Sequence, residues 1–346
     1  MTYKYKSFYF ILMLILSLCS SCSDTVKTLI PHRSWTCGMP DGIPVPEKGV
    51  EVFEVRMQLD QIYDIGNTPY GQRQVLVVRD GKVTGTRIQG SILPGGLDFQ
   101  LILPNNIIEI EQLLVIRTND GKYIYLRNAG TGINENDVRL VMDFEAPNDS
   151  FFAWLNTGKF VSRRIVDLSA KILKITVYDV SDFEDRNNAE NSVRISKPTD
   201  IPYQPWDYRK TTPSEKPEEQ IISETVTLGA SISIGISKRG IRNIIPITGG
   251  DLIGNITGKI LAGGADYQNF SNPATLDARY LWQADNGEVI IVRNAGTFGA
   301  LVPTFEARID GRYAWLNRGK YLSSNPEMID GGVSLTMYKS NGKEVK

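Results

Sequence analysis

The stretch Leu93–Gln100 (LPGGLDFQ) decides the fold, because it returns further along the chain as Leu261–Gln268 (LAGGADYQ). Other motifs are repeated around it in the same order. The spacing within each pair shortens only slowly, as expected when surface loops gain or lose single residues. The pairs are Arg127–Gly130 (RNAG) with Arg293–Gly296 (RNAG), Phe144–Glu145 with Phe305–Glu306, and Phe152–Asn156 (FAWLN) with Tyr313–Asn317 (YAWLN). The chain of 346 residues therefore contains one unit twice.

Each copy predicts short antiparallel strands, because apolar and polar residues alternate in runs that glycines interrupt. Asn286-Gly287 and Asp310-Gly311 predict hairpin turns. In the second copy the predicted strands are Glu224–Ser233, Arg242–Ile247, Leu252–Leu261, Leu276–Ala284, Glu288–Val292, Thr304–Ile309, Tyr313–Leu316 and Val333–Tyr338. We expect an all-β fold of two small antiparallel β-barrels in tandem, with about eight strands each.

The remaining segments divide the chain into five parts. We expect a signal peptide at 1–21, a tether at 22–49, a first barrel at 50–180, a linker at 181–220 and a second barrel at 221–340. Turn-forming residues and prolines in the tether favour an extended spacer that lifts the barrels off a membrane. The mixture of charge and proline in the linker cannot alternate as a strand.

The N-terminus resembles a bacterial lipoprotein signal peptide. Lys4 and Lys6 precede an apolar run that is too short to span a bilayer comfortably, and two serines then lead to Cys22. By that resemblance, cleavage before Cys22 leaves a lipid-modified cysteine and anchors the exported protein in the cell envelope, at the outer membrane or the cell surface. A cleaved peptide without lipid is one alternative, and an uncleaved membrane anchor is another. Cys19 is a competing site, although Leu18 before it is bulky.

Composition excludes several function classes. The net charge is −1 and no basic stripe occurs, so we expect no nucleic-acid partner. His32 is the only histidine and lies in the predicted tether, which excludes a Ser-His or Cys-His mechanism in the barrels. With Cys22 lipidated, Cys37 is the only remaining thiol, and we expect it to be packed and inert. We expect no metal and no cofactor.

The second copy resembles the DUF3237 family, also called UPF0311. The resemblance rests on Leu261–Gln268, Leu276–Tyr280 (LDARY), Phe305–Glu306 and Tyr313–Asn317, and it spans nearly all of residues 222–339. A poorer copy covers about 50–180. The resemblance implies a small β-barrel and no generally established activity.

The family pattern leads us to expect two arginines in each copy, and both copies depart from it. One belongs in the strand that contains Arg279, and the other lies shortly before the Phe-Glu pair. The second copy has Arg279 but places Ala300 at the other position, whereas the first copy has Arg139 there but Leu113 in the strand. A complete family site in each barrel is therefore in doubt.

The strand Leu276–Ala284 has two faces, and one of them is the barrel interior. If Asp277 and Arg279 face inward, the interior is polar and suits a small polar or anionic ligand; otherwise they form a solvated surface pair. Asp266 can also serve as a turn cap, Asn294 as a hairpin corner and Trp315 as core. The candidate ligand-binding residues are Arg242, Asp266, Gln268, Arg279, Asn294, Glu306, Trp315 and Asn317.

These residues predict a lipoprotein that binds a small polar molecule, a saccharide or an organic acid, in a barrel pocket. Arg279 or Arg242 would hold a carboxylate bidentately. One alternative is an isomerase, lyase or hydrolase without metal or nucleotide, in which Glu306, Asp266 and Arg279 act. The other is a structural envelope protein, which a barrel packed solid with apolar side chains would favour.

Overall fold

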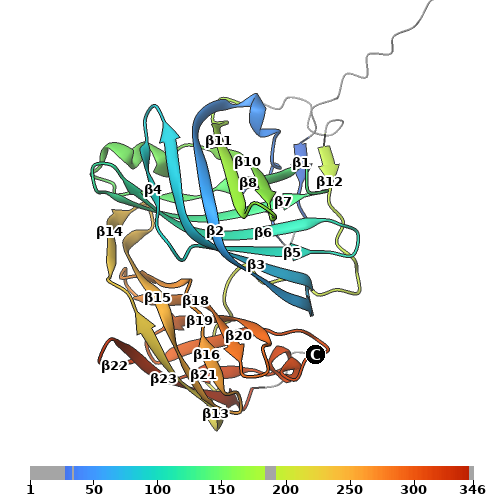
Figure 1. Ribbon diagram of the computed structural model, residues 1–346, viewed down its shortest axis with the longest axis vertical. Helices are drawn as coiled ribbons and strands as arrows, with labels where there is room; N and C mark the ends of the chain where they lie inside the picture. Colours follow the sequence, from blue (N-terminus) through green and yellow to red (C-terminus); the bar gives the residue numbers. More distant parts are fainter. Residues whose placement is uncertain (1–27, 33–34, 184–191, 343–346) are drawn as a thin grey trace, which may run out of the picture.

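The computed structural model describes residues 28–32, 35–183 and 192–342, and it consists of two β-barrels in tandem (Figure 1). Helical structure within these ranges is confined to three short 3-10 helices, η1 (Pro46–Lys48), η2 (Phe151–Asn156) and η3 (Ala314–Asn317). None of the described helices is long and apolar enough to cross a membrane. The prediction of an all-β fold with two tandem barrels is confirmed.

The first barrel is a closed ring of eight antiparallel strands in which β11 pairs with β2. Two short strands lie beside the ring: β4 (Gln89–Ile92), which pairs with β3 and β6, and β9 (Phe144–Glu145), which pairs with β7. The ring strands are β2 (Val50–Thr68), β3 (Gly71–Gly85), β5 (Leu97–Ile102), β6 (Ile108–Thr118), β7 (Tyr123–Gly132), β8 (Val138–Met142), β10 (Phe160–Asp167) and β11 (Ile172–Asp179).

The second barrel repeats this ring, and β13 closes it by pairing with β23. Three further strands, β14 (Ile232–Ser237), β16 (Gly258–Ile260) and β22 (Glu327–Ile329), attach to it. The ring strands are β13 (Pro217–Leu228), β15 (Gly240–Gly254), β17 (Ala265–Asn269), β18 (Thr275–Ala284), β19 (Val289–Thr297), β20 (Ala300–Glu306), β21 (Tyr321–Ser323) and β23 (Gly332–Ser340).

Three predicted strands of the second copy differ from the structure. Glu224–Ser233 is divided between β13 and β14, and Leu252–Leu261 between β15 and β16. The third is replaced by a 3-10 helix. Asn286-Gly287 does form the expected hairpin, between β18 and β19. Asp310-Gly311, in contrast, leads into η3, which occupies the stretch predicted as the strand Tyr313–Leu316. Tyr313 and Leu316 are both buried and lie three residues apart, a spacing that a 3-10 helix places on one side.

The described part of the predicted tether is packed against the first barrel. Its strand β1 (Thr28–Ile30) pairs in parallel with β12 (Ser192–Arg194) of the linker. Leu29, Cys37 and Ile43 are buried in one apolar cluster with residues of the barrel's outer surface, and burial raises the pKa of the Cys37 thiol. The spacer interpretation is therefore wrong for this part, because its apolar side chains are covered. The predicted signal peptide and Cys22 lie outside the described residues.

The two barrels pack against each other through their outer faces. A separate apolar cluster contains residues of both barrels, including Phe99 and Leu113 of the first and Ile244 and Leu281 of the second. At its centre the rings of Tyr125 and Tyr267 stack with centroids 5.0 Å apart. Each barrel therefore has an interior core and shares a third core with its sister copy.

Candidate ligand-binding site

The second barrel contains a cavity of about 380 Å³ in its interior. All but five of its lining residues are apolar. The five polar residues come from four different strands, and they are Glu224 (β13), Asp266 and Gln268 (β17), Tyr280 (β18) and Asn294 (β19). An apolar cavity with a small convergent polar group is the usual form of a small-molecule site.

Strand alternation positions these side chains. In β13, Glu224 shares a face with the buried residues Ile222 and Val226, so its carboxyl group points into the barrel. In β18, Ala278 and Tyr280 face the cavity, whereas Asp277 and Arg279 face outward. The polar lining of the cavity therefore consists of single polar residues on inward strand faces that are otherwise apolar.

Glu224 is 1% exposed, and its carboxylate accepts hydrogen bonds from two neutral side chains. Tyr280 donates its hydroxyl to Oε1 at 2.6 Å, and the indole N–H of Trp282 donates to Oε2 at 3.0 Å. Burial raises the pKa of the Glu224 carboxyl to about 7, although these two hydrogen bonds lower it. Both protonation states are thus populated near neutral pH.

Asp266 is the second carboxyl group of the cavity. Gln268 donates to Oδ2 at 2.7 Å, and the backbone N–H of Asp277 donates to Oδ1 at 3.1 Å. Asn243 in turn donates to Oε1 of Gln268 at 2.8 Å and so orients it. Burial raises the pKa of Asp266 to about 6 despite the two hydrogen bonds that it accepts.

Asn294 carries an unsatisfied acceptor. The residue is 4% exposed, and its Nδ2 donates to Oγ of Ser323 at 3.1 Å. Its Oδ1 is buried without a hydrogen-bond partner. An unpaired buried carbonyl costs about 1–3 kcal/mol, so a donor on a bound ligand would remove that cost.

The cavity brings together only part of the predicted site. Asp266, Gln268 and Asn294 line it. Arg242, Arg279 and Glu306 instead lie on the outer surface of the second barrel, where the first barrel covers them. The interpretation that Arg279 faces the interior is wrong, because the other face of β18 is the inward one. The solvated-pair alternative is also wrong, since Arg279 is 6% exposed.

Arg279 takes part in a buried charge cluster between the barrels. It donates to Asp277 at 2.8 Å and to both oxygens of Glu111 at 3.2 Å. Arg293 also binds Asp277, with two contacts of 2.8 Å. Burial alone would raise the pKa of Glu111, but Arg279 and Arg127 lower it to about 2. The cluster is thus an internal ion-pair network.

Glu306 and Arg242 belong to two equivalent ion pairs that join the barrels. Arg73 binds Glu306 bidentately at 2.6 and 2.7 Å, and Arg242 binds Glu145 bidentately at 2.7 Å. These are the same positions in the two copies, so each barrel supplies one arginine and one glutamate. The copies are therefore related by an approximate two-fold arrangement.

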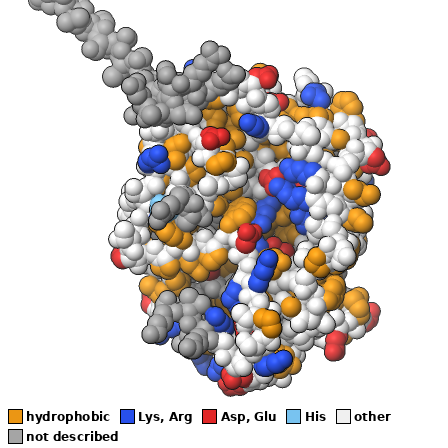
Figure 2. Space-filling view, turned by 180° about the vertical axis from the view of Figure 1, so that it is seen from behind, with side chains coloured by type: hydrophobic (Ala, Val, Ile, Leu, Met, Phe, Trp, Pro, Cys, Tyr) orange, Lys and Arg blue, Asp and Glu red, His pale blue; other side chains and the backbone are white. Residues whose placement is uncertain are grey.

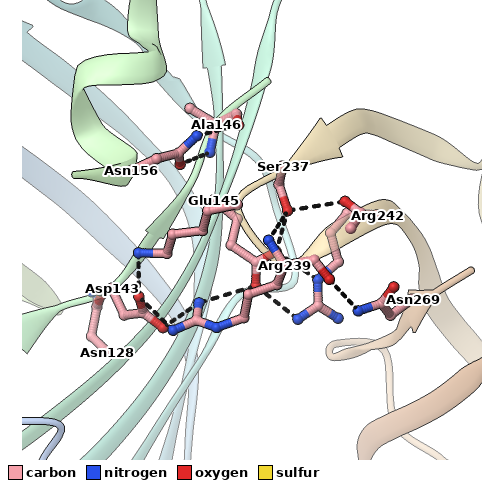
Figure 3. A network of polar contacts seen from close by, with 11 residues as sticks. Asn128, Asp143, Glu145, Ala146, Asn156, Ser237, Arg239, Arg242 and Asn269 are labelled. Carbon is pink, nitrogen blue, oxygen red and sulfur yellow. Dashed lines mark hydrogen bonds and ion pairs between the residues drawn. The ribbon is translucent and has the colours of Figure 1, made fainter. Parts of the chain in front are cut away.

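Polar contacts around Glu145 complete this side of the interface. Ser237 donates to Oε2 at 2.6 Å, and Arg239 contacts both Glu145 and Asp143, so side chains of β14 and β15 and of their turn converge on β9 (Figure 3).

On the face opposite to that of Figure 1, basic and acidic side chains lie side by side in a recess of the surface (Figure 2).

Asn317 and Trp315 lie in η3, away from the cavity. Both polar atoms of the Asn317 side-chain amide bind the backbone of Ala307, whose N–H donates to Oδ1 at 2.9 Å and whose carbonyl accepts from Nδ2 at 2.8 Å. Asn156 clamps Ala146 in the same way in the first copy (Figure 3). Trp315 is half-buried against the core of the second barrel. Both residues therefore stabilise the fold and do not contact the cavity.

Sequence reasoning missed Glu224 and Tyr280 as site residues. A signal for Glu224 was present, because an acid stands on the apolar face of a strand between Ile222 and Val226. A buried, unpaired acid on such a face is costly, so it indicates either a partner or a site. Tyr280 carried no such signal, since tyrosine is common in strands.

Comparisons with known proteins agree with this architecture. The family model described as "Protein of unknown function (DUF3237)" matches residues 48–182 and 219–300. A UPF0311 protein of Rhodopseudomonas palustris is 37% identical over 79 residues, which are 23% of this chain and 52% of the relative. The chain thus matches about half the length of that relative.

Two further relatives come from Clostridium acetobutylicum. A UPF0311 protein is 32% identical over 111 residues, which are 31% of this chain and 70% of the relative. A crystal structure of a protein with unknown function has 27% identity and a TM-score of 0.33, and the match covers 37% of this chain and 96% of that one.

Proposed function

The chain belongs to DUF3237, a family of proteins of unknown function, and we propose that its second barrel binds a small organic molecule in the cavity around Glu224, Asp266 and Asn294. The observation that supports this most is that two buried carboxyl groups and Asn294, whose Oδ1 has no hydrogen-bond partner, line one cavity of about 380 Å³. A ligand with hydrogen-bond donors would satisfy these acceptors, and its body would bury the apolar walls.

The lining residues narrow the ligand classes expected from the sequence. An organic acid is disfavoured, because the cavity is lined by two carboxyl groups and by no arginine or lysine among the described residues. A saccharide would meet the polar group but would also contact extensive apolar wall. The lining therefore favours a molecule with an apolar body and a donor-bearing polar end.

The protonation behaviour of the cavity favours acid–base catalysis as a second candidate. Glu224 and Asp266 have pKa values of about 7 and about 6, the range in which a carboxyl group can both donate and accept a proton. An isomerase or lyase acting on a bound ligand would use this pair. Glu306 and Arg279, expected from the sequence to share this role, are held in ion pairs at the interface.

A thermal-shift screen of the full chain against small alcohols, phenols, amines and carboxylates tests the binding proposal. Ligands that bind the native state raise the unfolding midpoint, and the rise grows with the logarithm of ligand concentration divided by Kd. We expect hits whose shift disappears in Ala278→Phe, which fills the cavity, and falls in Asn294→Ala. Shifts that persist in Ala278→Phe would place the site elsewhere. Turnover of a hit, followed by mass spectrometry, separates enzyme from binding protein.

We also propose that the protein is exported and anchored in the cell envelope through a lipid on Cys22. The support is the sequence pattern of residues 1–22 alone. Labelling cells with radioactive palmitate should mark the wild-type protein and not Cys22→Ala. Cys19→Ala is the matched control and should remain labelled; label that survives Cys22→Ala would contradict the assignment.

A further inference from the structure

We propose that the cavity of the second barrel binds a cationic ligand, an amine or guanidine on an apolar body. In the first barrel, the guanidinium of Arg164 occupies the position equivalent to that of the ligand's cation. This inference rests on the proposed function and adds the charge of the ligand to it. It follows from comparing the interiors of the two copies.

The register of the strands establishes which positions correspond. Leu140 pairs with Ser162 in the first barrel, and Leu301 pairs with Ser323 in the second. Two residues beyond each serine stand Arg164 and Asn325. Asp98 and Asp266 correspond through the repeated glycine-rich motif. The same carboxyl group is thus present in both interiors, but the arginine is present in only one.

In the first barrel, Arg164 fills the space beside Asp98. Its guanidinium binds the carboxylate bidentately at 3.0 and 2.9 Å, and the two side chains are 3% and 0% exposed. Gln112 donates to the same carboxylate at 2.8 Å and accepts from Asn128 at 2.9 Å. The charge of Asp98 is therefore balanced inside the barrel, as a buried carboxylate requires.

In the second barrel, that space is left open. The strand β21 ends at Ser323, and Pro326 cannot continue the hydrogen-bonding ladder. Asn325 is exposed and accepts a hydrogen bond from the backbone N–H of Gly299. Ala278 stands where the first copy has Gln112, which frees further volume next to Asp266.

The charges of the two interiors differ accordingly. Glu224 replaces Val55 of the first copy and adds a second carboxyl group. Within the described residues, neither carboxyl group in the second barrel forms an ion pair with a lysine or arginine, whereas Asp98 is paired with Arg164. The raised pKa values of Asp266 and Glu224 reflect burial without such a partner. A ligand cation beside Asp266 would supply the missing charge.

The opening of the cavity suits a ligand with an apolar body. Phe298 and Met328 line the cavity and are 55% and 81% exposed, so apolar side chains extend from its walls to the surface. A ligand whose apolar body reaches this rim would bury part of the exposed apolar surface.

Benzylamine, benzyl alcohol and benzoate test the inference, because they share one ring and differ in the charge of the substituent. Their affinities for the full chain are measured by calorimetry at pH 7. We expect benzylamine to bind at least about tenfold more tightly than benzyl alcohol, and benzoate to bind most weakly. Asp266→Asn should abolish the preference for the amine while benzyl alcohol still binds.

The outcomes separate the two proposals. If benzyl alcohol binds as tightly as benzylamine and Ala278→Phe removes both, the proposed function stands and the cationic ligand is refuted. If none of the three compounds binds at millimolar concentration, both proposals are overturned. An amine preference that survives Asp266→Asn also refutes the assignment of the cation to this carboxylate.

Removal of Arg164 provides a second test within the same chain. Arg164→Ala leaves the space of the deleted side chain beside Asp98, so we expect ethylguanidinium at millimolar concentration to bind there and to raise the unfolding midpoint of this variant more than that of the wild type. The double variant Asp98→Asn, Arg164→Ala removes both charges and should lose this extra shift. A folded Arg164→Ala protein that ethylguanidinium stabilises no more than the wild type would contradict the equivalence. If Arg164→Ala does not fold, the comparison of the three compounds decides alone.

Discussion

Replacing Glu224 by glutamine should make the protein more stable at alkaline pH and slightly less stable at acidic pH. The carboxyl group is fully buried and accepts hydrogen bonds from Tyr280 and Trp282 without a cation among these contacts. Glutamine keeps the size of the side chain but cannot ionise. The variant therefore isolates the cost of a buried negative charge from the effect of side-chain volume.

The size of the effect follows from the pKa of Glu224, which rises from 4.5 to about 7 on folding because the group is buried. At about 1.4 kcal/mol per pKa unit, this rise corresponds to about 3–4 kcal/mol. Below pH 4.5 the group is protonated in both states, and the native state carries no cost. The wild-type protein loses this stability progressively as the pH rises from about 4.5 to about 7, and Glu224→Gln does not.

Glutamine also loses one hydrogen bond, because its amide oxygen can accept from only one of the two donors, at a cost of about 1 kcal/mol. We therefore expect the variant to be about 1 kcal/mol less stable at pH 4 and about 2–3 kcal/mol more stable at pH 8. Urea unfolding at a series of pH values measures this crossover. Glu219→Gln is the control, because this side chain is 60% exposed and should change stability by less than about 0.5 kcal/mol throughout. A difference between Glu224→Gln and wild type that is constant with pH would refute the reasoning.

Three further substitutions test the interface, the helix clamp and the glycine motif. Arg73→Ala should lower the free energy of unfolding in urea by about 3–5 kcal/mol, because it leaves Glu306 unpaired in the interface. Adding Glu306→Ala should recover part of that loss of stability. If the losses of the two single variants simply add in the double variant, the pair is not coupled. Asn317→Ala removes two hydrogen bonds to Ala307 and should lower stability by about 1–3 kcal/mol while ligand affinity stays unchanged, so a selective loss of affinity would return this residue to the site. Gly264 has a φ of +79°, and a Cβ added there would lie only 1.9 Å from a backbone oxygen, so Gly264→Ala should prevent normal packing. Gly287→Ala is the control, because Gly287 has a φ of +87° and open space around it, and it should lower stability by about 1 kcal/mol in thermal unfolding. Similar effects of the two variants would contradict the close approach at Gly264.

The approximate two-fold packing explains why two copies of one barrel have different interiors. Both copies retain the outer arginine and glutamate that join them. Arg73 and Glu145 belong to the first copy and pair with Glu306 and Arg242 of the second, respectively. The interface needs these positions in both copies at once. The interior carries no such requirement, so a core arginine occupies the first barrel and an open cavity the second.

Part of the site was predictable from local pattern. Asp266, Gln268 and Asn294 were found because polar residues recur within motifs that both copies share, and all three line the cavity. Arg242 and Glu306 recur in the same way, yet they join the barrels. Repetition identifies residues that the unit needs and does not distinguish a ligand contact from a contact with the sister copy.

The amino-acid sequence by itself determined the duplication, the all-β class and the alternation of each strand, because these depend on local order along the chain. Only the tertiary structure decided that Ala278 and Tyr280 face inward and Arg279 outward, and that the outward face is buried by the sister barrel. The physical reason is that period-two alternation defines two faces of a strand without marking either as the interior. Closure of the ring and docking of the second ring make that choice, through contacts between residues far apart in the chain.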